Sequence, residues 1–242
     1  MSSKPKTVIV TGASQGIGAA VANLFLERGY NVVGTARGIT KQHAIKSSDR
    51  LALVDGDIGS PDTAKALVDT AVARFGGIDG LVNNAGIFFP KPFTEYTIED
   101  FRKLTSTNLD GFIYTTQLVI KQMLTQKRGG SVVSISTSLT DHPIAGFTAS
   151  VVMITKGGID AASRSLAMEY AKQAIRVNVV APGVVDTPLH QGTPKEVLRS
   201  LSPLGQLADA ADIAEAVLYL TEAKEITGEV LHVDGGAHLG RW

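Results

Sequence analysis

The sequence predicts an α/β fold: a doubly wound parallel sheet of about seven strands with helices on both faces. Three observations support this prediction. Short β-branched segments alternate with longer segments in which apolar residues recur at helical spacing. No internal repeat, low-complexity run or linker interrupts the alternation, and a glycine-rich segment joins the first strand-like run to the first helix-like one. Such an alternation requires crossover connections between parallel strands, and these connections place helices over both faces of the sheet.

Seven segments have the composition of strands. β-branched and other apolar residues dominate each of them, and turn residues bound them. The predicted strands are Thr7–Thr11, Asn31–Thr35, Leu51–Val54, Ile78–Asn83, Ser131–Thr137, Ile175–Ala181 and Glu229–Val233.

Helix boundaries carry recognisable signals. Ser60 followed by Pro61 is a helix start, because proline is favoured at the first helical position. Thr97 with Asp100 three residues later is a variant of the capping box. The predicted helices are Ile17–Arg28, Pro61–Phe75, a short one after Thr97, Asn108–Lys127, Ser150–Lys172, Pro194–Leu201 and Asp209–Thr221.

Composition excludes several classes of protein. With 242 residues, of which 44% are hydrophobic, the chain can form one α/β domain over residues 1–242. Its 23 basic and 23 acidic residues balance, so no long-range field favours nucleic acid as a partner. The chain has no cysteine, which excludes disulfides, thiolate metal sites and cysteine nucleophiles, and no metal site is predicted. Met1–Lys6 lacks the apolar core of a signal peptide, and no run of about 18 apolar residues occurs, so we expect a cytoplasmic protein without a membrane partner.

The glycine-rich segment Thr11–Gly18 has the properties of a phosphate-binding turn. Glycine tolerates positive φ and leaves room for a pyrophosphate near the backbone, and the following helix N-terminus offers free N–H groups. Because the turn follows the first strand and opens a helix, we interpret it as a Rossmann-type dinucleotide site and not as a tight turn alone. The candidate cofactor-binding residues in it are Gly12, Ser14, Gln15, Gly16, Ile17 and Gly18.

The end of the second strand indicates which dinucleotide is bound. An acidic residue there favours NAD, because it accepts from the ribose 2′-hydroxyl, whereas an arginine accommodates the 2′-phosphate of NADP. The segment Gly34–Arg37 has no acid, and Arg37 can hold a phosphate through two hydrogen bonds. The sequence therefore predicts NADP(H) in preference to NAD(H); the alternative is that Arg37 is a solvated surface residue.

With these motifs the chain resembles the short-chain dehydrogenase/reductase family, and the resemblance covers nearly all of its length. The matching motifs are Thr11-Gly12-x3-Gly16-x-Gly18, Asp57, Asn83-Asn84-Ala85-Gly86, Asn108, Pro182-Gly183-x3-Thr187 and Val233-Asp234-Gly235-Gly236. The resemblance implies that Asp57 contacts adenine, that Asn108 belongs to a catalytic tetrad and that the loop after Pro182 binds the nicotinamide carboxamide. The further cofactor-binding residues that it implies are Asp57, Ile58, Asn84, Ala85, Gly86, Lys156, Pro182, Gly183, Val185 and Thr187.

The chain departs from the family at the tetrad tyrosine. The family has Tyr-x-x-x-Lys on the helix after the fifth strand, where the lysine lowers the tyrosine pKa and the tyrosine exchanges a proton with the substrate oxygen. Lys156 is present, but Val152 stands four residues before it. Valine neither donates nor accepts a proton, so the resemblance supports cofactor binding more firmly than turnover.

The tetrad serine has two candidates. By register along the fifth strand it corresponds to Thr137, but the loop to Val152 is longer than usual in the family, so Ser138 is the alternative. Either hydroxyl can hydrogen-bond a substrate carbonyl. Both are also compatible with a capping role at the end of the strand.

Several groups could supply the proton in place of tyrosine. We favour a water held by Lys156, Asn108 and Thr137 or Ser138, because it requires no new side chain. His142 and His190 lie in neighbouring loops, and an imidazole titrates near neutrality; the alternative is that both are solvated. Of the tyrosines, only Tyr96 lies in a loop on the correct side of the sheet.

Two functions follow as hypotheses. The first is an NADP(H)-dependent oxidoreductase acting on a small-molecule carbonyl or alcohol; loss of the acid slows such a reaction by about 10²–10⁴ without abolishing it. The second is a catalytically impaired dinucleotide-binding protein that works as a sensor or partner subunit. The loop Val184–Leu201 would line the substrate site, where Leu189, Val197 and Leu198 suggest an apolar ligand. The resemblance also implies a homodimer or homotetramer built on the two long helices, with Gly157, Gly158, Ala161 and Ala162 allowing close packing.

Overall fold

The computed structural model of the protein, which describes residues 4–42 and 44–240, contains a seven-stranded parallel sheet. Its strands are β1 (Thr7–Thr11), β2 (Asn31–Ala36), β3 (Leu51–Asp55), β4 (Gly80–Asn83), β5 (Gly130–Ile135), β6 (Ile175–Pro182) and β7 (Val230–Val233). The strand order is β3-β2-β1-β4-β5-β6-β7. The chain therefore builds outward from β1 to β3 and then restarts on the other side of β1 with β4. Ligands of such sheets bind in the crevice at this switch point, beyond the carboxyl ends of the strands.

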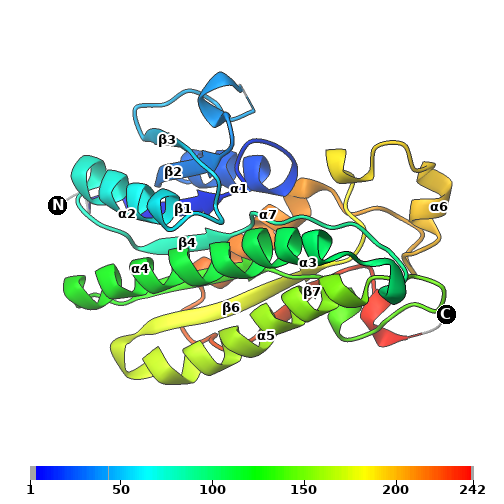
Figure 1. The fold of residues 1–242 in the computed structure, drawn as a ribbon. Helices are drawn as coiled ribbons and strands as arrows, with labels where there is room; N and C mark the ends of the chain where they lie inside the picture. Colours follow the sequence, from blue (N-terminus) through cyan, green and yellow to red (C-terminus); the bar gives the residue numbers. More distant parts are fainter. Residues whose placement is uncertain (1–3, 43, 241–242) are drawn as a thin grey trace.

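Helices cover both faces of the sheet (Figure 1). On one face, α1 (Gly16–Glu27) packs against α7 (Ala210–Glu222), and on the other lie α2 (Pro61–Phe75), α4 (Gly111–Gln126) and α5 (Ser150–Tyr170). Two shorter helices, α3 (Ile98–Thr105) and α6 (Lys195–Arg199), flank the carboxyl edge of the sheet. The predicted doubly wound fold is confirmed.

The core divides into two apolar layers because side chains alternate along each strand. In β1, Val8 and Val10 belong to the layer that includes Phe25 of α1 and Val217 of α7, whereas Ile9 belongs to the layer beneath α2 and α4. Strands buried on both faces therefore contain almost continuous apolar residues, as the sequence shows.

Two predicted boundaries differ from the structure where they affect the site. The strand predicted to reach Thr137 ends at Ile135, so the hydroxyl residues after it belong to a turn. The helix predicted from Asn108 begins at Gly111, because Ser106–Asp110 forms a π-helical turn between α3 and α4. Within the described part of the chain, no helix is both long and apolar enough to span a bilayer.

Candidate active site

The glycine-rich turn between β1 and α1 is compact enough to exclude side chains. Gly12 and Gly16 have φ angles of +66° and +52°, which favour glycine. A Cβ on Gly18 would lie 2.2 Å from the carbonyl oxygen of Gly12, and one on Gly12 would lie 2.8 Å from the Cα of Ala85. All three glycines are therefore required by the backbone geometry.

Hydrogen bonds fix this turn to the end of β4. The Asn84 Nδ2 group donates to the carbonyl oxygens of Thr11 (2.9 Å) and Gly12 (3.1 Å). The Thr11 hydroxyl oxygen in turn accepts from the backbone N–H groups of Asn84 and Ala85, each at 3.0 Å. The Asn-Asn-Ala-Gly segment and the glycine turn thus form one rigid unit at the switch point of the sheet.

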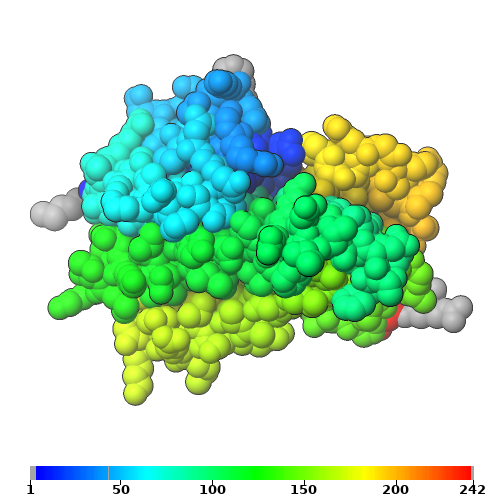
Figure 2. Space-filling model, viewed as in Figure 1, coloured from blue at the N-terminus to red at the C-terminus, as the bar shows by residue number. Residues whose placement is uncertain are grey.

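The residues around this turn fit a dinucleotide pyrophosphate. No side chain caps the N-terminus of α1, and its first turn carries no acidic residue, so its N–H groups are available to an anion. Thr187 lies on the other side of the turn, with its Cγ2 atom 3.4 Å from the Cβ position of Gly16. In Figure 2 the surface is hollowed between the blue N-terminal segments and the yellow segment around α6.

Arg37 lies just beyond β2, at the carboxyl edge, and its side chain is exposed. Asp55, which is not among the residues predicted from the sequence, ends β3 beside Ala36 in the sheet register. The Thr40 hydroxyl and backbone N–H both donate to the Asp55 carboxylate and hold its pKa below the usual range. Asp55 is therefore already bonded within the turn that follows Arg37.

Asp57 and Ile58 lie in the turn after β3. The Asp57 Oδ1 atom accepts from the Gly59 N–H at 3.0 Å, and the side chain is exposed. Ile58 is buried against Gly111 at the start of α4, where a Cβ would lie 2.9 Å from it. Asp57 thus has a free carboxylate oxygen at the edge of the site, while Ile58 anchors the turn.

Lys156 lies inside the protein, with 8% of its surface exposed. Its Nζ group donates to the carbonyl oxygen of Ile135 at 2.8 Å. A Cβ added to Gly86, next to the glycine turn, would lie 3.2 Å from this Nζ atom. Burial lowers the pKa of Lys156 to about 8, and the charge of Asp160 opposes this change.

Asn108 lies beside Gly86, as Lys156 does. Its Oδ1 atom lies 3.4 Å from the Cβ position of Gly86 and accepts from the Ile87 N–H at 2.9 Å. Its Nδ2 group donates to the carbonyl oxygen of Ile87 (3.1 Å) and to the Thr155 hydroxyl (3.0 Å). The π-helical turn therefore places Asn108 so that it braces the segment after β4 against α5.

Val152 is fully buried, with 0% of its surface exposed. It packs in a cluster with Leu104, Ala149 and Val151, and partly buried apolar side chains surround the cluster. These are Ile87, Phe88, Phe89, Tyr96 and Met153. Val152, at the position that carries tyrosine in the motif, is thus part of a small apolar core and has no polar side-chain atom of its own.

Thr137 and Ser138 occupy the turn after β5. The Thr137 hydroxyl oxygen accepts from the Leu139 N–H at 3.4 Å, which leaves its own hydrogen free to donate. Ser138 is buried, and its carbonyl oxygen accepts from the N–H groups of Asp141 and His142, both at 3.2 Å. The two candidates therefore differ in environment: Thr137 is partly accessible, and Ser138 points inward.

The other candidate proton donors differ in availability. The Tyr96 hydroxyl donates to the carbonyl oxygen of Phe89 (2.8 Å) and accepts from the Lys91 N–H (3.2 Å), so it is bonded within its own loop. His142 is exposed, and His190 is partly buried in the loop after Thr187, where burial lowers its pKa. Across residues 4–42 and 44–240, no three histidine or acidic side chains gather into a metal site.

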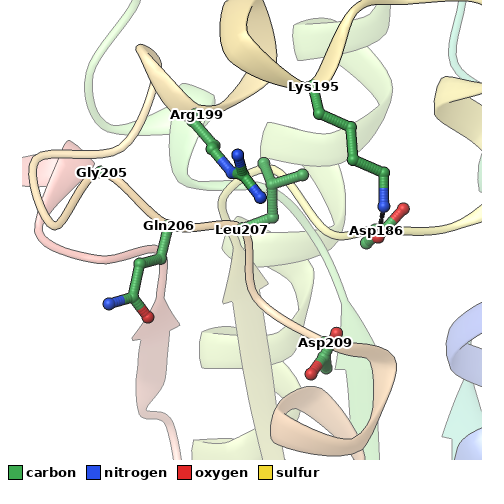
Figure 3. A pocket seen from close by; sticks show the side chains of 7 residues that line it. All are labelled: Asp186, Lys195, Arg199, Gly205, Gln206, Leu207 and Asp209. Carbon is green, nitrogen blue, oxygen red and sulfur yellow. Dashed lines mark hydrogen bonds and ion pairs between the residues drawn. The ribbon is translucent and has the colours of Figure 1, made fainter.

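A surface cavity of about 410 Å³ lies along the segment after β6 (Figure 3). It is lined by Asp186, Lys195, Arg199, Gly205, Gln206, Leu207 and Asp209, and Lys195 forms an ion pair with Asp186 at 2.5 Å. It contains neither Asn108 nor Lys156. In the predicted substrate loop Val184–Leu201, the three apolar side chains differ in exposure: Leu198 is buried, whereas Leu189 and Val197 are exposed.

Comparison with known proteins identifies the family. Residues 12–238 match the family model described as enoyl-(acyl carrier protein) reductase. Carbonyl reductase family member 4 of Xenopus tropicalis is 37% identical over 236 residues, which cover 97% of this chain and 98% of that protein.

Two solved structures have the same architecture over almost the whole chain. The 3-ketoacyl-(acyl-carrier-protein) reductase of Brucella melitensis in complex with NADH superimposes with a TM-score of 0.90 at 28% identity, covering 96% of this chain and 98% of that one. The protein ElxO with NADP bound gives a TM-score of 0.89 at 29% identity, with the same coverage. Together with the glycine turn and the Asn108–Lys156 pair, these matches show that the chain belongs to the short-chain dehydrogenase/reductase family of oxidoreductases.

Proposed function

We propose that this protein is an NADP(H)-dependent oxidoreductase that interconverts a small carbonyl compound and its alcohol through a non-standard proton transfer. In this proposal, residues 1–242 act as one dinucleotide-binding domain. A water held by Lys156 and by Thr137 or Ser138 carries the proton that the missing tyrosine would carry. One observation carries the proposal: Lys156 is buried beside Gly86, next to the glycine turn. Val152, four residues earlier, has no proton that Lys156 could help to transfer.

In this proposal, different residues of the chain hold the cofactor, the water and the substrate. When bound, the nicotinamide supplies or accepts the hydride. The glycine turn and the α1 N-terminus hold the pyrophosphate, and Thr187 closes over it. Lys156 holds the nicotinamide ribose with one N–H and the water with another, while Asn108 fixes the backbone of Ile87. The hydroxyl of Thr137 or Ser138 orients the substrate oxygen toward the water.

The preference for NADP(H) rests on Arg37. It is exposed beyond β2 and can form a bidentate contact with a 2′-phosphate, and Lys41, four residues later, adds a second cation in the same segment. Asp55, the acid at the end of the neighbouring strand β3, accepts a hydrogen bond from the Thr40 N–H. Among the structural relatives, one is bound to NADH and another to NADP, so the choice depends on this chain's own residues.

Cofactor titrations test this preference. We expect Arg37→Ala to raise the dissociation constant of NADPH by about tenfold or more, the size of a charge-assisted contact, and to leave that of NADH unchanged. Arg50→Ala is the matched control. Arg50 is also an exposed arginine, but it precedes β3 and therefore lies at the amino ends of the strands, whereas Arg37 lies at the carboxyl ends. A parent protein that binds NADH at least as tightly as NADPH would refute the preference.

A catalytically impaired binding protein is the second candidate, and Val152 is the observation that favours it. NADPH binding and NADPH oxidation, measured on the same preparation with a panel of ketones, aldehydes and diketones, separate the two. Carbonyl-dependent oxidation that is lost in Lys156→Met supports the enzyme. Tight binding without oxidation by any carbonyl supports the binding protein.

A further inference from the structure

Asp160 is a buried acid on α5, one helical turn after Lys156. Only 4% of its surface is exposed, and its Oδ1 atom has no hydrogen-bond partner among the described residues. A buried carboxylate oxygen without a hydrogen-bond partner is costly, because it loses its hydration. Such a residue on the sheet-facing side of α5 requires an explanation beyond packing.

The surroundings of Asp160 are polar and come from three elements. Burial raises the pKa of its carboxyl. The hydroxyls of Ser136, after β5, and Thr140, in the following turn, lower it, as does Arg164 one turn further along α5. Asp141, an exposed carboxylate in the same turn, raises it. Ser136, Thr140 and Arg164 thus favour the ionised form of Asp160, which burial disfavours.

Lys156 is a buried cation four positions before Asp160 on α5. Positions i and i+4 of a helix face the same side, so the Asp160 carboxylate and the Lys156 ammonium share one face of α5. Burial disfavours the charged form of Lys156, and the attraction of Asp160 favours it. Among the described residues, the ammonium donates to one acceptor, the Ile135 carbonyl oxygen, which is not an anion.

We infer that Asp160 is a positioning residue whose carboxylate keeps the Lys156 Nζ group in its ammonium form at neutral pH. The role rests on the proposed function in one respect: Lys156 must take part in proton transfer. NADPH, when bound, would supply the hydride to the carbonyl carbon, and the substrate oxygen would take a proton from the bound water. The water is reprotonated by Lys156 Nζ, and Lys156 later recovers its proton from solvent. The products are the alcohol and NADP⁺.

The first test needs neither cofactor nor substrate. Lysine labelled with ¹³C at Cε is titrated by NMR, and the Lys156 signal is assigned by its absence in Lys156→Arg. In Asp160→Asn we expect the Lys156 titration midpoint to lie about one pH unit lower, which is a tenfold larger acid dissociation constant. Asp141→Asn, which removes a nearby but exposed carboxylate, should leave the midpoint unchanged.

The second test follows the reaction. In Asp160→Asn, the alkaline limb of kcat/KM for carbonyl reduction should move to lower pH by the same amount, whereas the value on the acidic plateau stays near that of the parent. A residue that only stabilised the fold would lower the plateau and leave the limb in place. If Asp160→Asn fails to fold, Thr140→Val removes one hydroxyl that favours the Asp160 charge and should shift the Lys156 midpoint in the same direction by less.

An unchanged Lys156 midpoint in both variants would overturn the inference. If the midpoint shifts but neither parent nor variant oxidises NADPH with any carbonyl, Asp160 has its inferred effect on Lys156 and the proposed function is wrong. If the parent is active and the midpoint does not shift, the proposed function stands and the role of Asp160 is wrong.

Discussion

Among single residues, Val152 and Lys156 matter most for the proposed reaction. Val152 is fully buried in an apolar cluster with Leu104 and Val151. Lys156, one turn away, keeps its place beside Gly86. Val152 therefore offers no acidic group at this position, whereas Lys156 remains beside Gly86.

Restoring the hydroxyl tests whether the rest of the site is intact. We expect Val152→Tyr to raise kcat for carbonyl reduction by about 10²–10⁴, the usual contribution of a general acid. Its bulk must enter a packed cluster, which costs about 1–3 kcal/mol of stability. Val152→Phe adds the same ring without the hydroxyl and should show the stability loss without the gain in rate.

Equal rates for the tyrosine and phenylalanine variants would mean that the position no longer points toward the substrate. Steady-state kinetics on the carbonyl panel, together with thermal unfolding of both variants, provide both readouts.

At the scale of elements, the sequence predicted the segments well and their ends less well. The end of β5 was placed at Thr137 because Ser131–Thr137 is continuously β-branched or small, yet sheet pairing with β6 stops at Ile135. The π-helical turn around Asn108 has no periodic signal distinct from the helices on either side, so its effect on Asn108 was not predictable. The capping box at Thr97, which depends on local sequence alone, was predicted and is present.

That capping box gives a stability prediction. The Thr97 hydroxyl oxygen accepts from the Asp100 N–H at 3.1 Å, and the Asp100 carboxylate accepts from the Thr97 N–H at 3.1 Å. Thr97→Ala should lower the free energy of unfolding by about 1 kcal/mol, measured by denaturant titration. Ser60→Ala is the control, because Ser60 begins α2 without a side-chain capping bond, and its effect should be smaller. Equal losses in the two variants would contradict this account of α3.

For the molecule as a whole, the sequence predicted the doubly wound parallel sheet from the alternation of strands and helices, together with the glycine turn, whereas the strand order comes from the structure. What the sequence could not predict depends on distant segments meeting in space. Ser136 and Thr140, which lower the pKa of Asp160, belong to other elements than α5. Asp55 comes next to Ala36 only through the sheet register.

The assembly state is a further prediction at this scale. Ile113 on α4 and Ile154 and Met168 on α5 are 50%, 53% and 81% exposed, and the two helices lie side by side on one face of the molecule (Figure 1). We expect a second copy to cover this face. Ile154→Glu should then convert the assembly to monomers in analytical ultracentrifugation, whereas Val72→Glu on α2 should not. A parent protein that sediments as a monomer would exclude this interface.

In the proposed function, the dinucleotide site supports turnover through Lys156 without a tyrosine. The most direct measurement is a single-turnover reaction of NADPH-loaded protein with the carbonyl panel, followed by the loss of NADPH absorbance, in the parent and in Lys156→Met. The account predicts oxidation that requires the carbonyl and that falls by about 10²–10⁴ in the variant. Bound NADPH that no carbonyl oxidises, or equal rates in the two proteins, would contradict it.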